Sequence, residues 1–175
     1  FRSILITTYT AHHIEATIPA LESKKHVYLD KPIATRIEDS YRIIRAEKEE
    51  HNPLIMGFTR RYETPWRRVH DLLEQGTIGD LQMILLRSVI PYSRYLQRWH
   101  RDRKLSGGAL NDKASHHFDV FNWFSKSSPQ VIQAMGGRSS VFAPDPNAPK
   151  RCRECDRICP YRVLPSETVS ELGSF

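Results

Sequence analysis

The chain has 175 residues, with 26 Lys and Arg against 20 Asp and Glu, a net charge of +6 and 39% hydrophobic residues. This composition is typical of a globular domain and excludes collagen, coiled coils and disordered chains. Its apolar runs are much shorter than the roughly 20 residues of a membrane-spanning helix, and no secretory leader opens it. We therefore expect a cytoplasmic protein with no membrane partner. Both ends resemble cut ends, so we expect a fragment of a longer chain.

Residues 1–76 alternate short apolar strands with helices. Strands are predicted at Ser3–Thr8, His26–Leu29 and Leu54–Phe58, and helices at His12–Ser23, after Thr35, and from Thr64–Pro65 to Gly76. Such alternation indicates βαβ units and a parallel sheet. This part of the chain therefore resembles half of a doubly wound α/β domain.

Local signals define the second and third helices of this region. Thr35 with Glu38 three residues later predicts a capping box, and Ile37, Tyr41 and Ile44 predict an apolar face behind it. The third helix has Thr64 as N-cap and Pro65 in its first turn, and its predicted buried face consists of Trp66, Val69, Leu72 and Leu73.

The pattern changes after Gly79. We predict a long strand at Leu81–Ile90, a helix at Leu110–Ser125 and a strand at Gln130–Val141. Between the first two lies a polar, aromatic and basic connection, Pro91–Gly108, and loops of this length are usually functional or mobile. The proline-rich stretch Ala143–Leu164 is expected to be irregular.

The helix at 110–125 concentrates polar groups. Asp112, His116 and Asp119 stand at i, i+4 and i+7 and so share one face. A carboxylate one turn before a histidine can fix its tautomer and raise its basicity, which suits a general base. The alternative is a solvated polar face. A metal site formed by His116, His117 and Asp119 is a further alternative, although adjacent histidines on a helix point about 100° apart.

All three cysteines, Cys152, Cys155 and Cys159, lie within eight residues and precede Pro160. Their spacing equals the last three ligands of a bacterial ferredoxin run, but Pro149 stands where the first ligand would fall. Three interpretations remain open. They are a structural metal with a distant fourth ligand, free or partly paired thiols, and an iron–sulfur cluster.

The basic residues do not form one continuous patch along the sequence. The arginines form separate islands on different predicted elements without a nucleic-acid motif, so we expect no nucleic-acid partner.

Lys31–Pro32 follows the second strand, at the carboxyl edge where doubly wound sheets bind ligands. Lys31 is thus a candidate cofactor or substrate contact, the alternative being a solvated lysine.

Taken together, three segments resemble the GFO/IDH/MocA family of NAD(P)-dependent oxidoreductases, which includes glucose–fructose oxidoreductase and inositol dehydrogenases. Ile4–Pro32 is similar to the family's strand, Thr-Pro-Asn/Asp-x-x-His turn, helix and strand ending in Glu-Lys-Pro. Met56–Tyr62 with Trp66–Gln82 resembles its last Rossmann strand and Gly-x-Ile-Gly entry to the second domain. Ser106–Trp123 resembles its Gly-Gly turn and Asp-x-x-x-His-x-x-Asp helix. The segments follow the family's order over about residues 1–141.

The resemblance implies the second half of a Rossmann domain over 1–76, followed over 77–175 by part of an α+β open-sheet domain for substrate binding and oligomerisation. It implies NAD or NADP as cofactor, and hydride transfer to or from a hydroxyl-bearing carbon of a sugar, cyclitol or related polyol. The complete protein is then expected to be a homo-oligomer.

The resemblance also implies roles for individual residues. His116 would take the hydroxyl proton, Asp112 would orient substrate or histidine, and Lys31 would hydrogen-bond the substrate oxygen. The cofactor edge would be formed by Thr8, His13, Lys31 and Pro32, and further substrate contacts by Arg61, Tyr92 and Asp119.

Some positions depart from the family pattern. Asp30 replaces the usual Glu, Tyr9 and Thr10 replace Pro and Asn/Asp at the cofactor turn, and Ala114 replaces a common Gly. The altered turn at Tyr9 and Thr10 keeps open the alternative of a non-catalytic family member. A separate alternative is a basic cysteine-containing module that binds metal or nucleic acid.

The Gly-x-Gly-x-x-Gly turn that cradles a dinucleotide's pyrophosphate is absent from residues 1–175. We therefore predict that these 175 residues alone bind NAD(H) and NADP(H) poorly or not at all, because the main anion site is missing. Isothermal titration calorimetry tests this prediction. Micromolar affinity of residues 1–175 for either dinucleotide would contradict it.

Overall fold

A computed structural model describes residues 1–90 and 99–137, and the chain divides into two compact units, Phe1–Gln130 and Val131–Phe175. The regular elements described below all lie in the first unit. No helix within the described ranges is long and apolar enough to cross a bilayer. The domain boundary expected after residue 76 stays a prediction.

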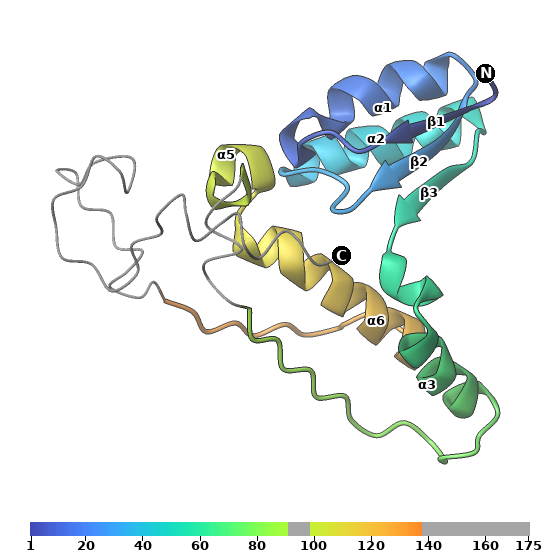
Figure 1. Ribbon diagram of the computed structural model, residues 1–175, viewed down its shortest axis with the longest axis vertical. Coiled ribbons are helices and arrows are strands. Elements are labelled where there is room, and N and C mark those ends of the chain that lie inside the picture. The colour runs from blue at the N-terminus through green and yellow to red at the C-terminus, as the bar shows by residue number, and fades with distance from the viewer. Residues whose placement is uncertain (91–98, 138–175) are drawn as a thin grey trace, which may run out of the picture. The chain divides into compact units, whose positions relative to one another are not determined.

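The predicted parallel sheet is confirmed (Figure 1). Its strands are β1 (Ser3–Ile6), β2 (His26–Asp30) and β3 (Leu54–Gly57), hydrogen-bonded in the order β1-β2-β3. The register pairs Leu29 of β2 with Ile6 on one side and Met56 on the other. All three strands therefore end at the same edge of the sheet.

Helices connect the strands and extend beyond the sheet. The longer ones are α1 (His13–Glu22), α2 (Ile37–Glu50), α3 (Thr64–Glu74) and α6 (Ser115–Ser125), with a single turn, α5 (Arg103–Ser106). The 3₁₀ turns within residues 1–90 and 99–137 are η1 (Thr10–His12), η2 (Thr59–Tyr62) and η3 (Trp99–Arg101), and a π-helical turn, η4 (Leu110–Ala114), leads into α6.

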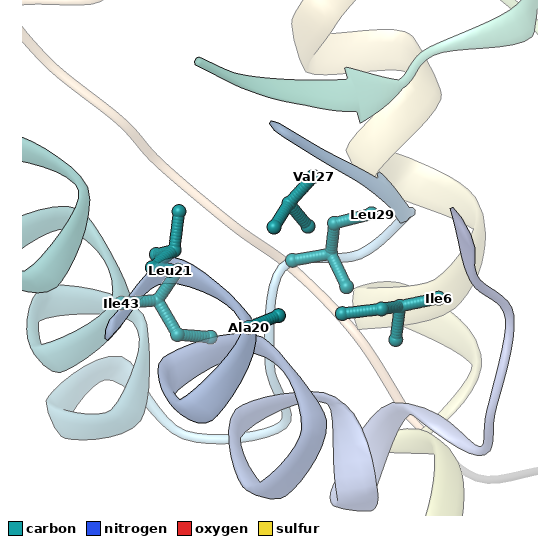
Figure 2. Close-up of a cluster of buried hydrophobic side chains, with 6 residues drawn as sticks. All are labelled: Ile6, Ala20, Leu21, Val27, Leu29 and Ile43. Atoms are coloured by element: carbon teal, nitrogen blue, oxygen red, sulfur yellow. The ribbon is translucent and has the colours of Figure 1, made fainter. Parts of the chain in front are cut away.

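The core lies between one face of the sheet and the helices α1 and α2 (Figure 2). The sheet and the two helices contribute the buried side chains Ile6, Ala20, Leu21, Val27, Leu29 and Ile43. Alternation along β2 places Val27 and Leu29 on this same face. The core therefore fixes β1 and β2, and with them the loops that follow their carboxyl ends.

Two expectations for α2 are wrong. The helix begins at Ile37 with Arg36 as N-cap, and no side chain caps it, so Thr35 and Glu38 form no capping box. The buried residue of α2 is Ile43, at 1% exposure, whereas the predicted apolar face is exposed at Ile37, Tyr41 and Ile44. The reason is that α1 and the sheet meet the face of α2 that carries Ile43.

The third helix differs from expectation in a similar way. It begins at Thr64 with Pro65 in its first turn, as predicted, but Glu63 is the N-cap. None of its residues is fully buried, and Val69 is 41% exposed. The Trp66 ring instead lies 6.2 Å, between centroids, from the Phe124 ring of α6.

The prediction of a strand at 81–90 is wrong: these residues have no regular secondary structure. Met83 and Leu85 are 84% and 90% exposed, and no neighbouring strand in the described residues offers this segment a hydrogen-bonding ladder. Residues 130–137 of the last predicted strand are likewise irregular. Residues 91–98 of the long connection, 138–141 of that strand and the stretch 143–164 lie outside the described residues.

We predict that Ile43→Ala lowers the free energy of unfolding by about 2–5 kcal/mol, because it removes a fully buried side chain. Ile37→Ala on the same helix should change it by no more than about 0.5 kcal/mol, because Ile37 is 65% exposed. Urea unfolding followed by circular dichroism measures both. Equal losses would contradict this assignment of the buried face of α2.

Candidate functional site

The central feature of the site is an ion pair between Lys31 and Asp112. Lys31 Nζ donates to Asp112 Oδ1 at 2.8 Å and to the Asp112 carbonyl oxygen at 3.0 Å. The side chains are 14% and 3% exposed. Two residues predicted separately as catalytic, 81 positions apart, therefore meet in a nearly buried contact.

Local hydrogen bonds hold both partners of this pair. On the Lys31 side, the Asp30 carboxylate accepts the Lys31 backbone N–H at 2.8 Å. On the Asp112 side, the Asn111 side-chain amide donates to the Ala34 carbonyl at 3.1 Å. The turn after β2 is thus bonded to η4 at two successive residues.

Gly107 is required for this junction. Its φ of +77° lies in the left-handed region, and a Cβ there would collide with the Asn111 side chain. The Gly107–Gly108 turn therefore allows the backbone to pass closely beside Asn111.

His116 lies in the first turn of α6, half-buried, with its ring edge toward Phe58 at 6.3 Å between centroids. Its Nδ1 is enclosed and has no hydrogen-bond partner in the described residues. Burial lowers the pKa of His116 from 6.5 to about 4, helped by the charges of Lys31, Arg60 and Lys113. The imidazole is therefore neutral at neutral pH.

This pKa corrects the expectation that Asp112 makes His116 more basic. Asp112 does act in that direction, but it is the smallest of the causes. Burial and three cations outweigh it, and its Oδ1 accepts a hydrogen bond from Lys31. Burial alone would raise the pKa of Asp112, yet Lys31, with smaller effects of Lys113 and His100, holds it below the ordinary value. Asp112 is therefore an ionised partner of Lys31.

Arg61 and Asp119 form a second ion pair, between η2 and α6. Arg61 Nε donates to Asp119 Oδ2 at 2.9 Å and Nη2 to Oδ1 at 2.8 Å, a bidentate arrangement. Asp119 is buried, and the Arg61 guanidinium lies 5.5 Å from the ring of Trp123. The pair fixes α6 against η2, and the substrate contacts predicted for both residues stay predictions.

Two of the three residues of the alternative metal site on this helix, His117 and Asp119, lie against arginines. Asp119 is bonded to Arg61, and His117 Nε2 lies 3.4 Å from Arg60 Nη2. Within the described residues no group of three or more His, Cys, Asp or Glu side chains has a metal-binding arrangement. His117 and Asp119 are thus each directed to a different arginine.

The residues predicted at the cofactor edge surround the ends of β1 and β2. His13 Nδ1 donates to the Pro32 carbonyl at 2.8 Å, and its Nε2 lies 3.2 Å from the Thr8 carbonyl. His13 is 1% exposed. The ring joins the two loops that follow these strands, and direct contact with a cofactor stays a prediction.

An open cavity of about 500 Å³ adjoins the end of β1, lined by Thr7, Thr8, Tyr9, His12 and Trp99. The Tyr9 and Trp99 rings lie 5.2 Å apart. Among the sequence candidates only Thr8 lines it. Trp99 and Arg60 were not identified individually, although the length of the connection at 91–108 and the arginine island at Arg60–Arg61 were available signals.

Four of the sequence candidates cannot be placed. Tyr92 and the cysteines Cys152, Cys155 and Cys159 lie outside the described residues. Their predicted roles stay predictions, and the three interpretations of the cysteine cluster remain open.

Comparison with known families gives two matches along the chain. Residues 1–58 match a family described as "Oxidoreductase family, NAD-binding Rossmann fold". Residues 66–148 match the "GFO/IDH/MocA C-terminal domain". Together the two matches cover most of the chain.

Individual relatives agree with these matches. An inositol 2-dehydrogenase of Saccharopolyspora erythraea is 31% identical over 75% of this chain and 38% of its own length. The myo-inositol 2-dehydrogenase of Thermotoga maritima is 28% identical over 77% and 39%. The chain thus spans about two fifths of the length of these relatives.

A similar solved structure is scyllo-inositol dehydrogenase from Lactobacillus casei with bound NAD(H) and scyllo-inositol. It matches with a TM-score of 0.64 and 28% identity, over 72% of this chain and 38% of that one.

We predict that His116 remains neutral at pH 6, because burial and neighbouring cations disfavour its protonated form. Lys31→Met should raise the His116 pKa toward its ordinary value, since one of those cations is removed. NMR of the ring nitrogens measures both effects. The control is Lys48→Met at an exposed position of α2, which should leave the His116 pKa unchanged. An imidazolium at pH 6 in the unmodified protein would contradict the prediction.

Proposed function

Because the chain belongs to the GFO/IDH/MocA family of oxidoreductases, we propose that it forms part of an NAD(P)-dependent dehydrogenase. The reaction transfers hydride between a nicotinamide and a hydroxyl-bearing carbon of a sugar, cyclitol or related polyol. Relatives named inositol dehydrogenases support the substrate class. The observation that carries the proposal is the Lys31–Asp112 pair beside a neutral His116.

The residues around β1 fit a flat cofactor ring. The cavity is walled by Tyr9 and Trp99, and aromatic faces stack on planar rings. Thr8 adds a hydroxyl at the same place. In this proposal Thr8, Tyr9 and Trp99 contact one ring-bearing end of the dinucleotide. His13, bonded to the Pro32 carbonyl, holds together the loops that follow β1 and β2. When bound, the nicotinamide supplies the acceptor for the hydride.

Lys31 retains a hydrogen-bond donor for substrate. An ammonium has three N–H groups, and in the described residues two of them are donated to Asp112. The third can donate to the oxygen of the reacting carbon. Asp112 therefore acts by orienting Lys31, whereas the sequence interpretation expected Asp112 to orient substrate or histidine.

His116 is the proton acceptor in this proposal. Its Nδ1 is enclosed, so a ligand can reach the imidazole only at Nε2. During oxidation the substrate O–H proton passes to Nε2, the C–H hydride leaves toward the nicotinamide, and a carbonyl forms. Lys31 stabilises the negative charge that develops on the oxygen. Because His116 is neutral, it is ready to accept the proton without first losing one.

We predict that His116→Ala in the full-length protein lowers the rate of hydride transfer by about 10²–10⁴-fold, the usual contribution of a positioned acid–base group. Lys31→Ala should also impair turnover, whereas His117→Ala should have a much smaller effect, because His117 lies toward Arg60. Single-turnover kinetics with folded variants that bind cofactor measure these rates.

The pH profile gives an independent check of the same assignment. Oxidation should lose activity on acidification with a midpoint near the His116 pKa of about 4, rather than near 6.5, because protonation removes the base. Near-normal turnover of His116→Ala, with hydride transfer rate-limiting, would exclude His116 and leave Lys31 as the candidate base.

A further inference from the structure

Asn111 lies where three segments of the site meet. Its side-chain Nδ2 donates to the Ala34 carbonyl at 3.1 Å and to the Ser106 carbonyl at 3.4 Å. Both acceptors belong to buried residues, and Asn111 itself is half-buried. An amide NH₂ group carries two N–H donors, so each donor meets one carbonyl oxygen. Asn111, within the turn η4, therefore joins the loop after β2 to the end of α5.

The acceptor on the α5 side is itself held in place. Ser106 is fully buried, and its hydroxyl donates to the carbonyls of His100 and Asp102 at 2.9 and 3.0 Å. The same hydroxyl oxygen accepts the backbone N–H of Gly108 at 2.9 Å. The amide is therefore bonded on this side to a backbone that several hydrogen bonds fix.

The other acceptor belongs to the loop that carries Lys31. Ala34 follows Lys31 by three residues, and Asp112 follows Asn111 directly. The amide bond to Ala34 and the ion pair between Lys31 and Asp112 thus connect the same loop to the same turn. The ion pair alone does not fix the spacing of these segments, because a lysine has a long, flexible stem. The shorter asparagine side chain supplies the more rigid connection.

We propose that Asn111 is a positioning residue for hydride transfer, which holds the loop of Lys31 at a fixed distance from η4 and so places the Lys31 ammonium at the substrate oxygen. This inference rests on the proposed function and adds a residue to it. Asn111 acts through Lys31, because its own N–H donors are bonded to backbone carbonyls rather than directed to a ligand. A misplacement of about 1 Å at a reacting group can cost about 10²-fold in rate, so a bond that sets this distance affects turnover.

The test replaces the amide in the full-length protein. Asn111→Leu keeps the number of side-chain heavy atoms, removes both N–H donors and adds no charge beside Lys31. With saturating NAD⁺ or NADP⁺, we expect the single-turnover rate of hydride transfer from myo-inositol, or from D-glucose if only the sugar is oxidised, to fall by about 10–100-fold. The Kd of the cofactor should change by less than about 3-fold, because Asn111 does not line the cavity at the end of β1.

Asn52→Leu is the matched control. Asn52 is half-buried and donates from Nδ2 to the Leu21 carbonyl at 3.2 Å, before the amino end of β3. Both variants leave a carbonyl without its side-chain donor, so both should lower the urea midpoint of unfolding. Asn52→Leu should nevertheless keep the rate of hydride transfer within about 2-fold of that of the unmodified protein. A rate loss confined to Asn111→Leu is then not explained by lower stability.

Combination with Lys31→Met shows whether Asn111 acts through the lysine. In a Lys31→Met protein, Asn111→Leu should cost less than about 3-fold in rate, because the group whose position it sets is already gone. Asn111→Ala, which also removes both donors, is used in the same experiments if Asn111→Leu does not fold.

The possible results separate this inference from the proposed function. A rate for Asn111→Leu within about 2-fold of that of the unmodified protein overturns the positioning role and leaves the dehydrogenase intact. A loss that adds in full to that of Lys31→Met overturns it too, as does a weaker cofactor Kd with an unchanged rate of hydride transfer. If neither myo-inositol nor D-glucose is oxidised with either cofactor, both the inference and the proposed function fail.

Discussion

The site depends on one buried ion pair, Lys31 with Asp112. Each charge is nearly excluded from water and is compensated by the other, so removal of either would leave an unpaired charge in the interior. The pair joins the carboxyl edge of the sheet to the π-helical turn before α6. Asn111 and His13 bond to the carbonyls of Ala34 and Pro32 in the same loop. The loop after β2 is therefore held from α1, from β2 and from η4, and it places Lys31 near His116.

This arrangement sets the charge state of the reacting groups. Burial and surrounding cations keep His116 neutral, while Lys31 keeps Asp112 ionised. In the proposed reaction, the third N–H of Lys31 would donate to the substrate hydroxyl oxygen and the Nε2 of His116 would accept the hydroxyl proton. A pKa of about 4 makes His116 a weak base, so transfer of the proton relies on stabilisation of the substrate oxygen by Lys31.

Sequence reasoning succeeded where the signal is local and failed where it depends on distant neighbours. The parallel βαβ sheet followed from short apolar runs between helical patterns, and the meeting of Lys31, Asp112 and His116 was anticipated through resemblance to a family. The buried face of α2 was wrong because Ile43 is selected by packing against α1 and the sheet, which periodicity alone does not reveal. The strand at 81–90 was wrong because a strand exists only with a partner. The direction of the His116 pKa shift was missed because spacing reveals Asp112 but neither the burial of the ring nor the charges of Lys31 and Arg60 on other elements.

A double-mutant cycle on the rate of hydride transfer tests the central claim most directly. The full-length protein, Lys31→Met, Asp112→Asn and the double variant are compared in single-turnover experiments at saturating cofactor. If Asp112 acts by orienting Lys31, the double variant loses no more than the more impaired single variant, because the two residues act as a unit. If the two losses add as independent free energies, Asp112 has a separate role in the reaction, and the account of the site built on this pair is contradicted.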